Sequence, residues 1–244
     1  MRAPSPAGES FPLAEGVVAL PGGFALLLAS RALVCADAHL GYEDVMGGGA
    51  ALPLWSTREI TAAIAAAAGR HAVREIVFLG DAIHGAALSE GAARAIRAAL
   101  ESLRGLAVVT IVAGNHEGRS RGVAVLGETV ESCERDGWTL LHGDKPEPAA
   151  ARTMIGHLHP SLRVGAGADG TVPAFLAAST LIVVPALTPY SSGLDVLGGA
   201  CRDALAPWGV GRSAMQVVAA TADRVFPFGS FGSLGSLAGR LRRG

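Results

Sequence analysis

Three apolar runs, separated by two stretches with helix signals, limit the fold of this chain more than any other feature. The runs cover residues 32–36, 75–79 and 107–113. Pro53 precedes a first helix expected over 56–68, and Ser89 can cap a second helix that ends near Arg104. Strands joined by helical crossovers form a parallel sheet, whose ligand site lies beyond the carboxyl ends of the strands. The sequence therefore predicts an α/β fold with its site at that edge.

Short apolar runs continue on both sides of this unit. They cover residues 16–20, 24–28, 138–141, 153–155, 173–178, 181–184 and 215–219. The later runs are separated by Gly and Pro turns, which predicts a second, more antiparallel sheet packed on the first. No linker divides the 244 residues, so we expect a single domain over 1–244, with poorly ordered tails at 1–10 and from about 229 to 244.

Six of the seven histidines fall in five short clusters, each placed directly after an apolar run. The clusters contain Asp37 and His39; Asp81 and His84; Asn115, His116 and Glu117; His142; and His157 and His159. Carboxylate, amide and imidazole groups that gather at strand ends can hold two divalent metal ions. This pattern predicts metal-assisted hydrolysis of a phosphate ester.

The first two clusters are ambiguous when each is taken alone. Asp37 and His39 could reach one ion from a strand exit, but a turn aspartate beside a surface histidine has the same pattern. Asp81 ends a wholly apolar strand, where a carboxylate is stabilised by bridging two ions, although it could instead cap the next helix. Three roles stay open for His84: a substrate contact, an outer-shell partner of the metals, or a structural histidine.

The later clusters are more specific. Asn115 offers a neutral carbonyl oxygen to a metal, and we expect His116 to donate a proton to the leaving oxygen, with Glu117 orienting its ring. His142 ends a run in the same manner as the earlier clusters. If the stretch from His157 to His159 is extended, the two side chains lie on one side and can address two ions.

The order of these clusters, DxH, GDxx, GNHE, H and GHxH, resembles that of the calcineurin-like metallophosphoesterases. The resemblance runs from residue 37 to residue 159, and it implies a four-layer α/β/β/α sandwich of two packed mixed sheets flanked by helices. It also implies one metal site of Asp37, His39, Asp81 and His159, and a second of Asp81, Asn115, His142 and His157. A hydroxide between the two ions would attack phosphorus in line, while His116 assists the leaving group.

Further segments are similar to a small prokaryotic branch described as SbcD-related or DNA-ligase-associated phosphoesterases. These segments cover residues 37–43, 141–146, 156–160 and 185–195. Two positions depart from the pattern: His84 stands where many members carry a second aspartate, and Thr188 where we expect asparagine. Both departures concern substrate contacts, for which Asn115, His84 and Arg119 are the candidates.

Charge and composition leave the substrate open. The net charge is −1, so attraction for nucleic acid must be local, through Arg119 and Arg121 after the third cluster or through the tail arginines 240, 242 and 243. The three cysteines are odd in number and widely spaced, which argues for free thiols and a reducing cytoplasm. There is no run of ~20 apolar residues to cross a membrane.

We therefore expect a dinuclear metal-dependent phosphoesterase, in particular a phosphodiesterase, that uses two divalent ions. Mixed imidazole and oxygen ligands favour Mn²⁺, with Fe, Co, Zn or Ni as alternatives. Two other functions remain open on the same fold: a DNA endonuclease or exonuclease in repair, and a non-catalytic binding module. The sequence does not address the oligomeric state.

Overall fold

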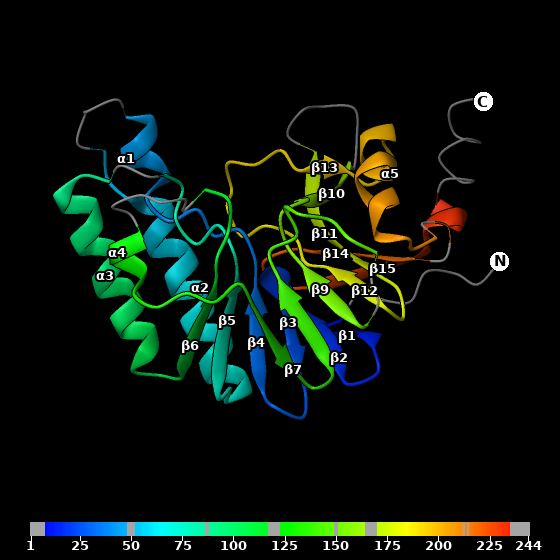
Figure 1. Cartoon of the computed structure of the whole chain (residues 1–244), viewed down its shortest axis with the longest axis horizontal. Coiled ribbons are helices and arrows are strands. Elements are labelled where there is room, and N and C mark those ends of the chain that lie inside the picture. The colour runs from blue at the N-terminus through cyan, green and yellow to red at the C-terminus, as the bar shows by residue number, and fades with distance from the viewer. Residues whose placement is uncertain are drawn as a thin grey trace.

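Two β-sheets packed face to face form the centre of the molecule, and helices cover both outer faces (Figure 1). Figure 1 shows the computed structural model of the chain. The structure describes residues 8–47, 52–85, 88–116, 123–148, 151–163, 170–211, 213 and 215–234. This architecture confirms the predicted α/β/β/α sandwich of two mixed sheets.

The first sheet contains the predicted parallel unit. Its six strands, in spatial order, are β1 (Phe11–Ala14), β2 (Val17–Leu20), β3 (Phe24–Leu27), β4 (Ala32–Cys35), β5 (Glu75–Leu79) and β6 (Val108–Val112). From β1 to β4 each strand is antiparallel to its neighbour, whereas β4, β5 and β6 are parallel. A short 3-10 helix, Pro21–Gly23, connects β2 to β3.

The parallel strands read as continuous apolar runs because both of their faces are buried. In β4 and β5, Leu33 and Phe78 pack toward the helices, while Val34 and Val77 pack toward the second sheet. All four side chains are fully buried. Each fully buried side chain of this size contributes about 1.5–3 kcal/mol, so the strands that lead to the polar clusters are firmly held.

Helices α2 (Trp55–His71) and α3 (Glu90–Arg104) cover the outer face of this sheet, with the shorter α1 (Tyr42–Met46) and α4 (Val123–Leu126) beside them (Figure 1). The predicted cap is present, since the Ser89 hydroxyl accepts a hydrogen bond from the backbone N–H of Ala92 at 3.2 Å. Within the described ranges, no helix is both long enough and apolar enough to cross a membrane.

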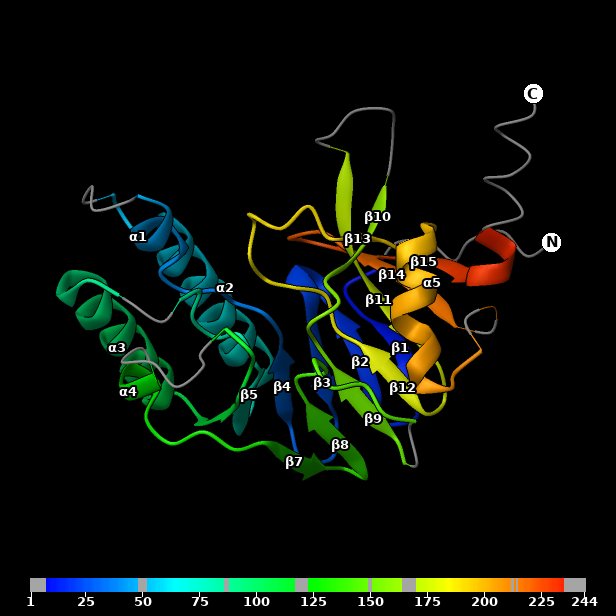
Figure 2. The same ribbon diagram turned by 45° about the horizontal axis from the view of Figure 1, so that its top comes forward.

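The second sheet has nine strands. They are β7 (Ser132–Arg135), β8 (Trp138–Leu141), β9 (Thr153–Ile155), β10 (Pro160–Arg163), β11 (Thr171–Ala177), β12 (Leu181–Val183), β13 (Leu194–Asp195), β14 (Gln216–Ala220) and β15 (Val225–Ser230). The main path runs β13-β10-β11-β12-β9-β8-β7, and β14 joins β11 to β15. Helix α5 (Gly199–Leu205) and the 3-10 turn Ala206–Trp208 cover its outer face (Figure 2).

Most pairings in this sheet are antiparallel, as expected. The strands that lead to His142 and His157 are an exception, since β8 and β9 are parallel and β9 is parallel to β12. The connection between β8 and β9 returns the chain to the starting edge, so these two strands run in the same direction. As a result His142 and His157 leave the sheet at one edge.

Parts of both expected tails belong to the fold. Gly8 pairs with Val225 in an isolated antiparallel bridge. At the other end, β15 extends to Ser230 and the side chain of Phe231 is buried against the outer face of the second sheet. Packing contacts with the second sheet therefore continue past residue 229.

An ion pair joins the two sheets on the side away from the polar clusters. Glu75 begins β5, and its carboxylate accepts two hydrogen bonds of 2.7 Å from the Arg135 guanidinium of β7 and one of 2.6 Å from the Thr110 hydroxyl. The Glu75 side chain is only 11% exposed. Burial would raise the pKa of Glu75, but the bonds from Arg135 and Thr110 outweigh it and lower the pKa.

We expect Arg135→Ala to lower the free energy of unfolding by about 1–3 kcal/mol at neutral pH, because it leaves the Glu75 carboxylate without its main partner. The depressed pKa means that this contribution is present above the unfolded pKa of glutamate and is lost as pH falls through the folded value. Urea unfolding at pH 7 and near pH 3 measures this. An equal loss of unfolding free energy at both pH values would contradict the ion-pair explanation. Arg224→Ala, which removes an exposed arginine, is the control.

Candidate metal centre

The predicted clusters meet at one edge of the sandwich. Strands β4, β5 and β6 of the first sheet and β8 and β9 of the second all end there, and each is followed directly by one of the five clusters. Three groups of possible ligands result. The first is Asp37 with His39 and His159, the second is Asp81 with His142 and His157, and the third is His39 with His84 and His116. In each group the ligand atoms lie within 4.8 Å of one another.

The backbone at these residues is left-handed. Positive φ angles occur at Asp37 (49°), His39 (46°), Asp81 (42°), His157 (59°) and His159 (44°). Such a conformation costs a non-glycine residue about 1 kcal/mol or more and persists only where the surroundings impose it. It also corrects one expectation: the segment from His157 to His159 is not extended, and its two imidazoles enter different groups because the backbone turns at each residue.

Two glycines make room for the site. A Cβ on Gly80 would overlap the imidazole of His142, and a Cβ on Gly114 would overlap the backbone and carboxylate of Asp81. The glycines in the GD and GN pairs are therefore required by close packing between strand ends. Substitution at either position would displace a candidate ligand.

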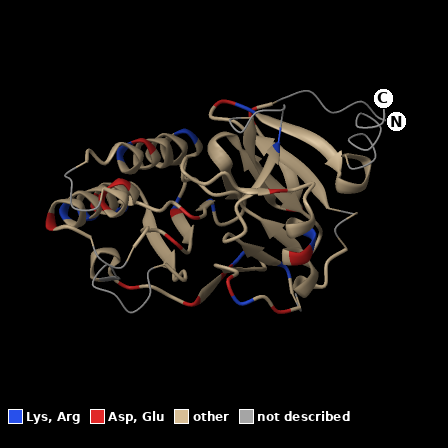
Figure 3. Cartoon of the chain, turned by 90° about the horizontal axis from the view of Figure 1, so that it is seen from above, with Lys and Arg blue, Asp and Glu red and all other residues tan. Residues whose placement is uncertain are grey.

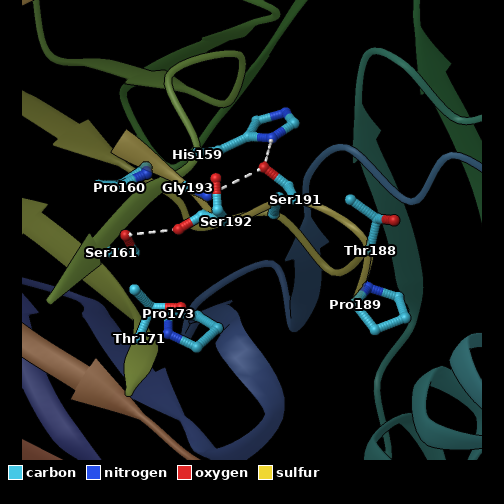
Figure 4. A pocket seen from close by; sticks show the side chains of 11 residues that line it. His159, Pro160, Ser161, Thr171, Pro173, Thr188, Pro189, Ser191, Ser192 and Gly193 are labelled. Carbon is cyan, nitrogen blue, oxygen red and sulfur yellow. Dashed lines mark hydrogen bonds between the residues drawn. The ribbon is translucent and has the colours of Figure 1, made fainter. Parts of the chain in front are cut away.

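The first group surrounds a buried oxygen without a partner. The Oδ2 atom of Asp37 accepts the backbone N–H of His157 at 2.8 Å, whereas its Oδ1 has no hydrogen-bond partner among the described residues. That Oδ1 lies 3.4 Å from Nε2 of His159. On its other side the His159 ring is held by Ser191, whose hydroxyl lies 2.8 Å from Nδ1 (Figure 4). Ser191 thus turns the free nitrogen of His159 toward Asp37.

The second group is organised around His142. Its Nδ1 lies 3.0 Å from the carbonyl oxygen of Leu79, which can only accept, so Nδ1 carries the proton. In the neutral ring Nε2 then has a lone pair, and it faces Oδ1 of Asn115 at 2.9 Å, Nδ1 of His157 at 3.2 Å and Oδ2 of Asp81 at 3.4 Å. Several electron-rich atoms therefore face one another across a small space.

The electrostatics of this site attract positive charge. Burial lowers the pKa of His39 to about 3, with the neighbouring imidazoles acting in the same direction, so this ring is neutral. Burial would raise the pKa of Asp81 and lower that of His142, but their mutual hydrogen bond and charges outweigh it, giving about 2 for Asp81 and about 9 for His142. The Asp81 carboxylate therefore stays ionised, and the raised pKa of His142 reflects the attraction of this carboxylate for positive charge.

This donor set fits divalent metal ions. Ligand bonds of about 2.0–2.2 Å place the donor atoms of one ion about 3 to 3.5 Å apart. Asp37 Oδ1 and His159 Nε2 are 3.4 Å apart, and His142 Nε2 and His157 Nδ1 are 3.2 Å apart. The unpartnered Oδ1 of Asp37 is the main observation, because a fully buried carboxylate oxygen is otherwise costly. A cation between Asp37 and His159 would satisfy it.

His84 connects His39 to His116. Its Nδ1 lies 3.1 Å from Nδ1 of His39, so one ring donates to the other. Its backbone carbonyl lies 3.1 Å from Nδ1 of His116 and can only accept, which places a proton on that nitrogen. If His39 is the donor to His84, Nε2 of His39 keeps its lone pair. This geometry favours the outer-shell role among the three open for His84.

We expect His84→Ala to weaken binding of the metal ion next to His39 by about 10-fold or more, since outer-shell partners of ligating histidines have effects of this size. His84→Asn offers an amide oxygen as acceptor and should lose less. Competition with a chromophoric chelator measures the affinity. Equal metal affinity in the wild type and His84→Ala would assign His84 to the substrate instead.

An open cleft of about 230 Å³ lies beside the first group. Its lining comprises His39, Tyr42, His84, His116, His159, Thr188, Tyr190 and Ser191. Sequence reasoning assigned no role to Tyr42, Tyr190 or Ser191, although all three lie in segments that carried the family resemblance. Glu117, Arg119 and Arg121, and the tail arginines 240, 242 and 243, lie outside the described residues.

Comparison with known proteins supports the fold. No family model matches the chain, and no curated protein matches it. Among solved structures, nuclease MPE from Pseudomonas putida is similar, with a TM-score of 0.65 and 21% identity over 87% of this chain and 94% of that chain. The phosphoesterase YfcE from E. coli gives a TM-score of 0.39 and 17% identity over 76% and 86% of the two chains.

Proposed function

We propose, from the premise that this chain has the calcineurin-like metallophosphoesterase fold, that it is a metal-dependent phosphoesterase and in particular a phosphodiesterase. The observation that carries the proposal is the buried Oδ1 of Asp37, which has no partner among the described residues and faces His159 inside a converging donor set. A structural core would leave no such oxygen unpaired.

In this proposal Asp37, His39 and His159 hold one ion, Asn115, His142 and His157 hold the other, and Asp81 lies between them. Bound divalent ions would polarise a phosphoryl oxygen and lower the pKa of the attacking water. The mixture of imidazole and oxygen donors suits Mn, Fe, Co or Zn better than Mg, and we propose Mn²⁺ with Fe, Co, Zn and Ni as alternatives.

The chain itself supplies the proton that the reaction requires. Hydrolysis adds the oxygen of water to phosphorus and breaks the bond to the leaving oxygen, which must then gain a proton. His116 lines the cleft, and its Nδ1–H is fixed by the carbonyl of His84, so Nε2 is the nitrogen left to face the leaving oxygen. From the doubly protonated ring, Nε2 would donate the proton. The backbone N–H of His116 donates to Asp81 at 2.9 Å and fixes its place beside the metal groups.

Hydrolysis of bis-p-nitrophenyl phosphate across a panel of Mn²⁺, Fe²⁺, Co²⁺, Ni²⁺, Zn²⁺ and Mg²⁺ tests this function. We expect turnover that disappears with EDTA and returns on adding the ion, with Mn²⁺ among the most active. Absence of turnover with every ion, in protein that nevertheless binds metal, would favour a binding module on the same fold.

A nuclease is the second candidate. One solved structure with a similar fold is named a nuclease, and the cleft is lined by Tyr42 and Tyr190, whose rings would be able to stack on a nucleobase. Digestion of single-stranded against duplex DNA, each at several salt concentrations, would separate this reading from hydrolysis of small phosphodiesters.

We further infer that the protein works in a reducing compartment such as the cytoplasm. Cys35 and Cys133 are free thiols, and burial raises the pKa of both. Such thiols are inert, which fits a structural role.

A further inference from the structure

Four aromatic rings contact one another in a row from the candidate proton donor to the rim of the cleft. His116 lies over His84 with ring centroids 5.3 Å apart and planes within 23°. Tyr42 lies against His84 at 4.5 Å, and Tyr190 stacks on Tyr42 at 4.2 Å with planes within 17°. Tyr190 ends this row and is 44% exposed. Tyr42 covers one face of the Tyr190 ring.

The Tyr190 ring is fixed in place by a buried carboxylate. Its hydroxyl donates to Oε1 of Glu43 at 3.0 Å, and burial together with this bond raises the pKa of Tyr190. Glu43 is itself held by the backbone N–H of Ser56 at 2.6 Å and by the Ser56 hydroxyl at 2.9 Å. An exposed aromatic ring ordinarily has rotamer freedom that a ligand would have to restrict. Here the folded chain has already restricted it.

Among the described residues, the side chains that line the cleft are histidine, tyrosine, threonine and serine, without lysine or arginine. Elsewhere in the described part of the chain, Lys and Arg are interspersed with Asp and Glu over the molecule (Figure 3). The described lining therefore offers ring stacking and hydroxyl groups for recognition beyond the phosphate.

We propose that Tyr190 is a stacking platform for the nucleobase attached to the scissile phosphate, so that the substrate is a nucleotide phosphodiester. This inference rests on the proposed function, whose substrate class it specifies. Base stacking on an aromatic side chain tolerates any base, because every base has a π-face. Tyr190 is thus a specificity determinant that favours nucleotides over other phosphodiesters without selecting a sequence.

Equilibrium binding measures this platform independently of turnover. Two probes that share a sugar phosphate, thymidine 5′-monophosphate and 2-deoxyribose 5-phosphate, are titrated calorimetrically into the Mn²⁺-loaded full chain. We expect the nucleotide to bind about 5- to 100-fold more tightly, the range for stacking one base. Tyr190→Leu should bring the ratio close to one, while Tyr190→Phe keeps the ring and should retain most of it.

Trp55→Leu is the matched control, because Trp55 is an aromatic residue 63% exposed and outside the cleft lining, and it should leave the ratio unchanged. A ratio near one in the wild type, or an unchanged ratio in Tyr190→Leu, overturns the platform whether or not bis-p-nitrophenyl phosphate is hydrolysed. A clear ratio without hydrolysis supports the platform and removes the enzyme instead. The thermal midpoint of each variant shows that it is folded.

Discussion

Asp81→Asn should lower turnover of bis-p-nitrophenyl phosphate by about 10³-fold. Asparagine preserves the shape and can still accept the backbone N–H of His116, now made by Oδ1 of Asp81 at 2.9 Å. It removes the negative charge that lies 3.4 Å from Nε2 of His142 and that both proposed ions share. Several kcal/mol of transition-state stabilisation depend on such ions, and each 1.36 kcal/mol corresponds to about tenfold in rate.

The metal content of this variant decides the cause of the loss. We expect Asp81→Asn to retain fewer than two equivalents of Mn²⁺ after dialysis, while Asp203→Asn, an exposed carboxylate on α5, retains full content and activity. A variant that keeps both ions and loses turnover would show that Asp81 is not shared between them. Full activity in Asp81→Asn would remove the dinuclear proposal.

His116→Gln should lower turnover by about 10²- to 10⁴-fold without loss of bound metal, since general acid catalysis contributes that much. The effect should depend on the leaving group. p-Nitrophenolate needs little protonation, whereas an alkoxide needs a full proton, so the loss should be larger for an alkyl phosphodiester than for bis-p-nitrophenyl phosphate. The measurement compares the turnover rates of the variant and the wild type for the two substrates, together with the metal content of each protein.

His71→Gln is the control for this substitution, because His71 ends α2 and does not line the cleft. It should leave turnover and metal content unchanged. An equal loss for both leaving groups in His116→Gln would argue that His116 stabilises charge on the phosphoryl group. Loss of metal together with activity would assign His116 as a ligand.

The strand ends and the identity of the polar residues could be predicted well from sequence. The apolar runs at 75–79, 138–141 and 153–155 correspond to β5, β8 and β9 without any shift in their bounds. Such runs are informative because a strand buried on both faces consists almost entirely of apolar residues, so the change to glycine and polar residues marks its end. A polar residue directly after it must then lie at the sheet edge, where the clusters were expected.

The direction of the strands in the second sheet was not predictable in the same way. Short strands separated by Gly and Pro favour hairpins, and β10, β11 and β14 do pair antiparallel. The parallel run of β8, β9 and β12 depends on how longer connections cross the sheet, which local turn signals do not contain.

By itself, the sequence determined which chemistry this protein has available: carboxylates, an amide and imidazoles placed at the ends of apolar strands. Only the tertiary structure decided how these groups are arranged relative to one another. Three contacts join residues far apart along the chain: His142 with the carbonyl of Leu79, His84 with His39, and Tyr190 with Tyr42. These contacts depend on left-handed turns and close glycine packing between two sheets, and such long-range geometry leaves no periodic signal in the sequence.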